Sequence, residues 1–199
     1  MASKKNNFIK DALALCIITL VAGVLLGFVY ELTKGPIEEA ALKAKLAAYE
    51  AVFAGASIEA DDALTEMIAS PEYASALSAA GVEKATVMEA YKALDASGNL
   101  IGYVMTTDST AGYAGQISIS VGMKVDGSVT GMEFLVLNET QGFGSKAANP
   151  EHKDKYVGFA ADSFKLGDNV DAISGATVTS KAVNNAMNAA LVFVKQLAQ

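Results

Sequence analysis

The sequence predicts an α+β protein in which an N-terminal transmembrane helix precedes a domain outside the cytoplasm, built from an antiparallel sheet packed by helices. Three features predict it: an uncharged run near the N-terminus, a series of short β-prone runs separated by turn signals, and an amphipathic pattern near the C-terminus. With 199 residues, the chain has room for one domain with its own core and a modest extra segment.

The uncharged run from Ala12 to Tyr30 has the length of a membrane span, because at 1.5 Å per residue it reaches roughly 28 Å. Three basic residues precede it: Lys4, Lys5 and Lys10. The positive-inside rule therefore keeps residues 1–11 in the cytoplasm and exports the chain after the span. A cleaved signal peptide is the alternative, but the run exceeds a typical signal core and no A-x-A site directly follows it. Residues 12–30 are therefore predicted as a single uncleaved anchor in the cell membrane.

Residues 31–84 are predicted as a helical connecting region. Gly35 and Pro36 interrupt the chain, and Pro36 suits the first position of a new helix. Four apolar residues then recur at helical spacing: Leu42, Leu46, Tyr49 and Phe53. They predict an amphipathic helix whose apolar stripe packs in a core. The stretch Gly55–Lys84 suits one or two short helices and carries no recognisable chemistry.

Residues 85–199 are predicted as the folded domain. Its β-prone runs are Tyr91–Leu94, Leu100–Thr107, Gln116–Val125 and Val129–Leu137. Asp95–Asn99 and the pair Asp126-Gly127 are hairpin signals between these runs, so an antiparallel meander with one face toward the helices is expected. An amphipathic helix from Thr179 almost to Gln199 closes the chain.

Charge and residue usage exclude several classes of function. The net charge is −7, and all 15 basic residues are lysines. The exported part is acidic, so nucleic-acid binding is disfavoured. Cys16 is the only cysteine, which excludes a disulfide framework. His152 is the only histidine, so no metal site is expected. We interpret His152 as a surface loop residue. Nucleotide-binding glycine motifs and complete nucleophile constellations are missing, so no independent catalytic site is expected.

Hydroxyl side chains gather around Gly175 in the segment Asp171–Ser180 (DAISGATVTS), directly ahead of the closing helix. The unpaired N–H groups and the positive dipole end of a helix start favour an anion such as phosphate. Without arginine, a phosphate must be held by backbone N–H groups, hydroxyls, lysine or a covalent bond. The alternative is that Thr177 or Thr179 only caps the helix. These residues by themselves leave both interpretations open.

Three further motifs precede SGATVTS: GYAGQI at 112–117, VDGSVTG at 125–131 and NETQGFG at 138–144. Together, and in this order, the four motifs resemble the FMN-binding domain family found in the G subunit of the Rnf complex and in the C subunit of the sodium-translocating NADH:quinone reductase. The anchor and the stretch TKGPIEE at 33–39 also match. Only Gly55–Lys84 lies outside the resemblance.

The resemblance implies that Thr177, the threonine of G-A-T, carries FMN through a phosphoester bond that a dedicated flavin transferase makes from FAD. Residues expected to cradle the phosphate are Ser174, Gly175, Ala176, Thr179 and Ser180. Residues expected on the ring side are Glu139, Thr140, Gly142 and Gly144. Two positions depart from the family's usual residues, because Gln141 replaces proline and Phe143 replaces leucine. Phe143 keeps an apolar contact that can lie against the isoalloxazine ring.

The function implied is that of an electron carrier in an Rnf-type complex, moving electrons between ferredoxin and NAD while sodium ions or protons are translocated. Its partners are then the other membrane subunits of the complex. The C subunit of the quinone reductase is an alternative, and the shorter extramembrane part of this chain favours Rnf. A membrane-anchored binding or assembly module without redox function, in which SGATVTS is only a capped loop, is a second alternative.

Overall fold

The computed structural model describes residues 3–198, with side chains from Phe8 onward. Residues 1, 2 and 199, at the ends of the predicted cytoplasmic segment and the predicted flavin domain, lie outside the described residues. The chain forms two compact units that divide between Lys43 and Ala44. Each unit is described by itself.

Helix α1 spans Ser3–Val52 and contributes most of its residues to the first unit. Its most apolar 18-residue window has a mean hydropathy of 2.8 and no buried residue, and within the described chain it is the one helix long and apolar enough to cross a membrane. The predicted interruption at Gly35 and Pro36 is wrong, because α1 continues through both residues. The φ angle of proline is itself helical, so Pro36 removes one hydrogen bond while the long segments on either side remain helical.

The second unit contains one five-stranded antiparallel sheet with the strand order β1-β2-β3-β4-β5, which confirms the predicted meander. The strands are β1 Ser57–Ala60, β2 Ala85–Leu94, β3 Leu100–Ser109, β4 Ile117–Lys124 and β5 Val129–Leu137. The sequence did not predict β1, because this four-residue edge strand is mostly exposed and lacks an alternating apolar pattern. It is held in place by pairing with β2.

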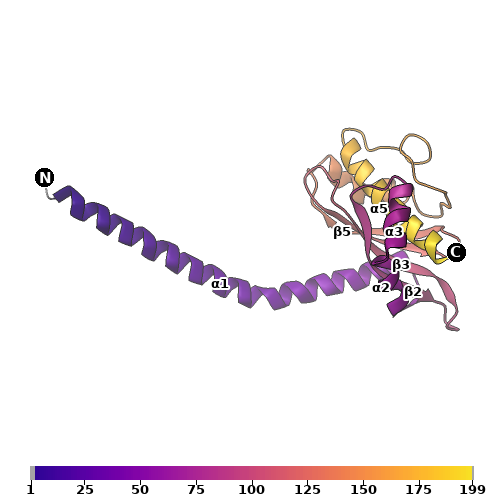
Figure 1. Cartoon of the computed structure of the whole chain (residues 1–199), viewed down its shortest axis with the longest axis horizontal. Helices are drawn as coiled ribbons and strands as arrows, with labels where there is room; N and C mark the ends of the chain where they lie inside the picture. Colours follow the sequence, from indigo (N-terminus) through magenta and orange to yellow (C-terminus); the bar gives the residue numbers. More distant parts are fainter. Residues whose placement is uncertain (1–2, 199) are drawn as a thin grey trace. The chain divides into compact units, whose positions relative to one another are not determined.

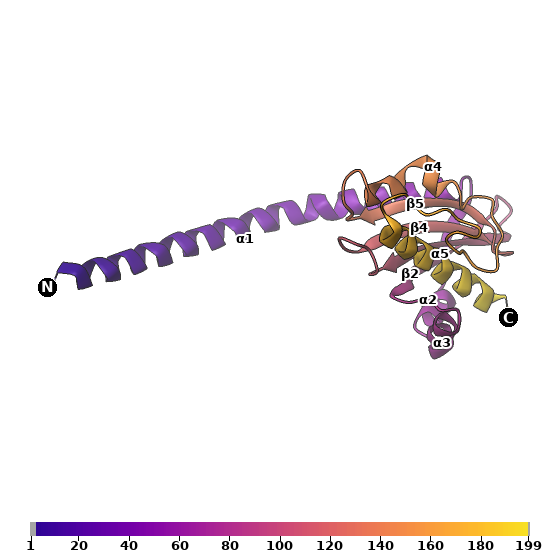
Figure 2. The same cartoon turned by 90° about the horizontal axis from the view of Figure 1, so that it is seen from above.

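Helix α5, Thr177–Leu197, lies against β2, β3 and β4 and covers one face of the sheet (Figure 1), as the view from above also shows (Figure 2). Two short helices, α2 Asp62–Ile68 and α3 Pro71–Ala79, occupy the region predicted to hold one or two. The buried Tyr73 hydroxyl accepts a hydrogen bond from the Val87 N–H and donates one to the Ala189 carbonyl, both at 3.1 Å. Tyr73 thus joins α3, β2 and α5, and its burial raises its pKa to about 12.

The last turns of α1 cover the other face of the sheet, where Tyr49, Val52 and Phe53 pack against Ala93 and Val104. Two glycines paired across β4 and β5 permit this close approach: Gly122 and Gly131. A Cβ atom at the first would lie 2.4 Å from the Val52 oxygen, and one at the second 2.7 Å from the Val52 Cα.

The predicted apolar stripe of α1 is only partly correct. Tyr49 and Phe53 are buried, but Leu42 and Leu46 are exposed. The buried stripe is formed instead by the consecutive pairs Ala48-Tyr49 and Val52-Phe53. Within the second unit, the buried residues of α1 lie in its last turns, so the apolar spacing read from the sequence does not by itself determine burial.

Two loops and the start of α5 meet at one end of the sheet. Ser109 at the end of β3 pairs with Ile117 at the start of β4, which in turn pairs with Leu137 at the end of β5. The β3–β4 loop and the segment after β5 therefore leave the sheet side by side. That segment continues through the 3-10 helix η1, Gly144–Ala148, and helix α4, Pro150–Lys153, before the chain returns to α5.

Candidate cofactor site

A cavity of about 550 Å³ lies where these three segments meet. Its lining comes from the β3–β4 loop, the segment after β5 and the start of α5: Tyr113, Glu139, Thr140, Phe143, Gly144, Gly175, Ala176, Thr177, Val178 and Thr179. The volume is within the usual range of small-molecule and cofactor sites, about 300–1,000 Å³. None of the lining residues carries a positive charge.

Thr177 is the first residue of α5, and its side chain is exposed in the cavity. The N-cap residue is Ala176, and no side chain caps the helix. Neither Thr177 nor Thr179 therefore acts as a capping residue, which was the alternative left open by the sequence. The first N–H groups of a 21-residue helix, together with its dipole, provide the donors and the positive potential that suit a phosphate.

The backbone before α5 is shaped by a left-handed glycine and by a buried serine. Gly175 has a φ angle of +76°, and a Cβ atom there would lie 3.3 Å from the Phe143 ring. The Ser180 hydroxyl accepts a hydrogen bond from the Ile173 N–H at 2.9 Å and donates one to the Ala176 carbonyl at 3.0 Å. These two bonds connect the loop to the first turn of the helix.

Glu139 links two of the segments that line the cavity. Its Oε1 accepts a hydrogen bond from the Tyr113 N–H at 2.7 Å, while its Oε2 is buried and has no partner among the described residues. A Cβ atom at Gly144 would lie 2.6 Å from Thr179 Oγ1 and 2.7 Å from Glu139 Oε2, so glycine is required there. A cavity lined by backbone N–H groups and hydroxyls at the start of α5, and by two aromatic side chains and a carboxylate from the other two segments, fits the phosphate, ring and polar edges of FMN.

The structure brings most of the predicted site residues together around this cavity, namely Glu139, Thr140, Gly144, Gly175, Ala176, Thr177 and Thr179. Ser174, Gly142 and Ser180 do not line it. Ser174 is exposed, Gly142 forms a turn with a φ angle of +79°, and Ser180 is buried with its hydroxyl engaged in the loop. Two lining residues were not singled out from the sequence: Tyr113 and Val178. The only signal for Tyr113 was its place in GYAGQI, and for Val178 its place between two threonines.

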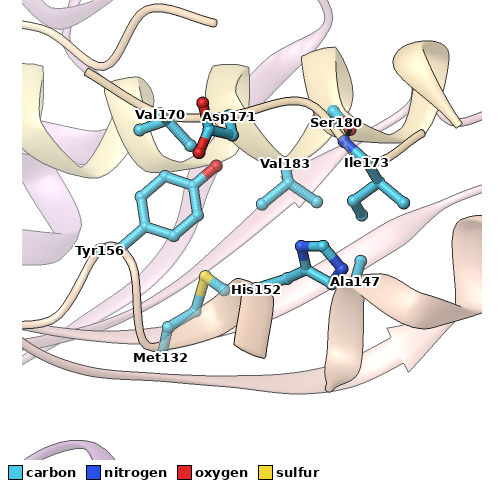
Figure 3. A pocket seen from close by; sticks show the side chains of 9 residues that line it. All are labelled: Met132, Ala147, His152, Tyr156, Val170, Asp171, Ile173, Ser180 and Val183. Carbon is cyan, nitrogen blue, oxygen red and sulfur yellow. Dashed lines mark hydrogen bonds between the residues drawn. The ribbon is translucent and has the colours of Figure 1, made fainter. Parts of the chain in front are cut away.

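A second, smaller cavity of about 20 Å³ lies behind the loop and includes Ser180, Ile173 and His152 in its lining (Figure 3). This is about the room that one water molecule needs. The predicted surface position of His152 is wrong, because the residue lies on α4, is half-buried and places its Nδ1 atom in the interior without a partner among the described residues. The position of His152 beside Ile173, Ser180 and Val183 could not be predicted from sequence spacing.

Comparison with known protein families gives two matches along the chain. Residues 112–192 match the family described as FMN-binding domain, and residues 1–52 match the family described as RnfG N-terminal region. The match over residues 112–192 contains every residue that lines the cavity. The match over residues 1–52 ends at the last residue of α1.

Two relatives extend these matches. The chain is 30% identical, over 96% of its length and 93% of the relative, to the G subunit of the Na(+)-translocating ferredoxin:NAD(+) oxidoreductase complex of Acetobacterium woodii. It is 39% identical to the G subunit of an ion-translocating oxidoreductase complex of Methanosarcina acetivorans, over 52% of this chain and 57% of that protein. Among solved structures, NqrC from Shewanella oneidensis aligns with a TM-score of 0.45 and 27% identity, covering 55% of this chain and 60% of the other.

Proposed function

The chain belongs to the RnfG family, the G subunits of ion-translocating oxidoreductase complexes, and we propose that it carries electrons within such a complex on an FMN group bound covalently through its phosphate to Thr177. The complex is of the Rnf type and transfers electrons between ferredoxin and NAD, coupled to the translocation of sodium ions or protons. The other membrane subunits of the complex are its partners, and a flavin transferase attaches the cofactor.

The single observation that carries this proposal is the exposure of Thr177 at the start of α5, inside a cavity of cofactor size. A transferase must align one hydroxyl with the phosphate of its donor, so the acceptor has to be accessible. Thr179 is only 1% exposed and Ser180 is buried with both of its hydrogen bonds made. Ser174 is exposed but does not line the cavity.

The residues of the chain bind and orient the cofactor. The free N–H groups at the start of α5 donate to the phosphate, and Gly175 lets the backbone pass close to it without a side chain in the way. Phe143 and Tyr113 provide apolar surface for a planar ring. When bound, FMN supplies the electron-transfer chemistry itself. No acid or base of the chain is needed for that transfer, which agrees with the proposal that this protein has no catalytic site of its own.

The proposed location of the domain outside the cytoplasm gives a reason for covalent attachment of the cofactor. The apolar part of α1 fits a single-pass anchor, and three lysines before the span favour a cytoplasmic N-terminus. The FMN-binding domain is then outside the cytoplasm. A dissociable cofactor would be lost there by dilution, whereas a phosphoester retains it.

Co-expression of the full chain with a flavin transferase tests the attachment. We expect the wild-type protein to stay fluorescent on a denaturing gel, and mass spectrometry to find the FMN phosphate on the peptide that contains Thr177. Thr177→Val removes the hydroxyl with little change in shape, so it should abolish the fluorescence, while its thermal unfolding should match that of the wild-type chain made without the transferase.

The matched control is Thr179→Val, which removes a hydroxyl two residues further along α5 and should keep the flavin. Covalent flavin on Thr177→Val would show that another hydroxyl is the acceptor. A wild-type chain that remains free of flavin in the presence of an active transferase would exclude the electron-carrier function and favour a binding or assembly module.

A further inference from the structure

The His152 side chain turns into the interior of the domain. His152 lies on α4 and is half-buried, and its Nδ1 atom is buried without a hydrogen-bond partner among the described residues. Polar atoms in protein interiors are bonded to protein or to ordered water in the large majority of cases, because an unpaired one costs the free energy of its desolvation. His152 does not line the cofactor cavity, so this nitrogen requires a partner elsewhere.

The cavity of about 20 Å³ lies beside this histidine. Figure 3 shows the imidazole ring pointing from α4 toward Val183 of α5 and Ile173 of the preceding loop. A cavity of roughly 10–15 Å³ is enough to hold one water molecule. The space therefore suits one water molecule and is too small for a larger ligand.

The cavity also offers hydrogen-bond partners to a water molecule. Besides His152, its polar lining comes from Tyr156, Asp171 and Ser180. The Tyr156 hydroxyl donates to Asn184 Oδ1 at 2.7 Å, so its oxygen can still accept. A buried water molecule makes roughly two to four hydrogen bonds, and an entirely apolar cavity stays dry. The imidazole nitrogen and the hydroxyl oxygen meet the lower number.

The same cavity lies behind the turn that precedes Thr177. The Ile173 carbonyl accepts a hydrogen bond from the Ala176 N–H at 2.9 Å, which closes the turn, and the Ile173 N–H donates to Ser180 Oγ at 2.9 Å. Ile173 is buried and lines the cavity, whereas the two residues at the tip of the turn are exposed. Ile173 is therefore the fixed end of the turn, and whatever fills the cavity supports it.

We propose that one water molecule bonded to His152 Nδ1 fills this cavity, and that His152 is thereby a positioning residue for the turn that presents Thr177. The bonded water satisfies the nitrogen and supports Ile173 from behind. Without it, the turn would border a void or shift inward, and the Thr177 hydroxyl would be presented in more than one orientation. The consequence for flavin attachment rests on the proposed function, but the water site and the order of the turn do not.

Two variants of equal shape isolate the contribution of the nitrogen. His152→Asn keeps a polar atom at the branch position of Nδ1, His152→Leu places a methyl group there, and both lack the outer part of the ring. Hydrogen exchange, followed by mass spectrometry, is measured on the full-length protein in detergent, made without the transferase. In the peptide that contains Ile173 and Ala176, we expect about fivefold faster exchange for His152→Leu, the factor that corresponds to one hydrogen bond of roughly 1 kcal/mol.

His152→Asn should exchange at close to the wild-type rate in this peptide. Ser180→Ala removes the acceptor of the Ile173 N–H and is the positive control, so it should speed exchange there. Equal exchange in His152→Asn and His152→Leu would overturn the proposal, because the polar atom would then make no difference to the turn.

The rate at which an active transferase adds FMN to the full chain is the second measurement. Thr177 is intact in both variants, so His152→Leu should be flavinylated several-fold more slowly than His152→Asn. A merely structural contribution of the side chain would lower the thermal unfolding temperature of both variants without separating their flavinylation rates. Equal flavinylation rates would overturn the positioning role.

A high-resolution crystal structure of the wild-type chain keeps the proposal testable if His152→Leu does not fold. An ordered water within hydrogen-bond distance of His152 Nδ1 would support the proposal, and a dry cavity would overturn it. The outcomes also separate this inference from the proposed function. Faster exchange of the turn in His152→Leu, together with a wild-type chain that an active transferase leaves without flavin, would refute the proposed function and support the water site.

Discussion

Gln141 occupies the second position of the turn from Thr140 to Phe143, where the family usually has proline. The Phe143 N–H bonds to the Thr140 carbonyl, and Gly142, in the third position, has a φ angle of +79°, as in a type II turn. Proline is common in the second position of such a turn. The Gln141 N–H donates to no acceptor within the described residues, so proline would remove no hydrogen bond.

Gln141→Pro should therefore be tolerated. By reducing the conformational freedom of the unfolded chain, it is expected to raise the free energy of unfolding by up to about 1 kcal/mol. Thermal unfolding of the full chain measures the change, and Gln141→Ala, which keeps the N–H group, is the control for loss of the side chain. A marked loss of stability in the proline variant alone would mean that the N–H is needed.

At the scale of elements, the end of α1 is attached to the sheet by a polar cluster on β2 and β3. Glu89 accepts hydrogen bonds from Lys45, from the Tyr91 hydroxyl at 3.0 Å and from the Tyr49 hydroxyl at 3.3 Å. Tyr49 also shares a hydrogen bond of 2.8 Å with Thr106. Burial raises the pKa of Tyr49 well above its usual value. Desolvation acts to raise the pKa of Glu89, but the bonds from Lys45, Tyr91 and Tyr49 outweigh it and lower that pKa.

The lowered pKa of Glu89 predicts an acid-sensitive contact. A carboxylate whose pKa is lower in the folded state contributes stability above its ordinary pKa of 4.5 and loses that contribution as the pH falls through the lowered value. Because the side chain is partly exposed, the contribution should be roughly 1 kcal/mol or less. Thermal unfolding from neutral to acidic pH should therefore show a smaller loss of stability for Glu89→Gln than for the wild type. A curve for Glu89→Gln that runs parallel to that of the wild type would contradict the assignment.

At the scale of the whole molecule, the chain combines the apolar helix α1 with an FMN-binding domain. The FMN-binding domain has its own core on both faces of the sheet, built from α5 on one side and the end of α1 on the other. The apolar part of α1 has no buried residues. A long exposed apolar surface of this kind is stable in a lipid environment and not in water.

The three lysines before the apolar run predict the side of the membrane on which the domain lies. A reporter that is active only outside the cytoplasm should be active when it is fused after Gln199. The same reporter fused ahead of Lys4 is the control and should be inactive. Activity of a strictly cytoplasmic reporter at the C-terminal position would reverse the orientation and remove the reason for covalent retention.

The sequence by itself determined the features that local patterns encode. The span was visible as an uncharged run, the meander as β-prone runs separated by hairpin signals, and α5 as a 3.6-residue periodicity that the structure places only two residues earlier. Each of these depends on neighbouring residues alone. The loop ahead of α5 was also visible, because its glycine and hydroxyl residues lie close together in the sequence.

Only the tertiary structure decided which of these residues face the cavity. Thr177 is exposed while Thr179 and Ser180 are buried, although all three carry a hydroxyl at the start of one helix. Tyr113 joins the site through Glu139, 26 residues away, and His152 is half-buried beside Ser180 and Val183 of α5. The physical reason is that burial and orientation depend on contacts between segments far apart in the chain, and no local periodicity encodes such contacts.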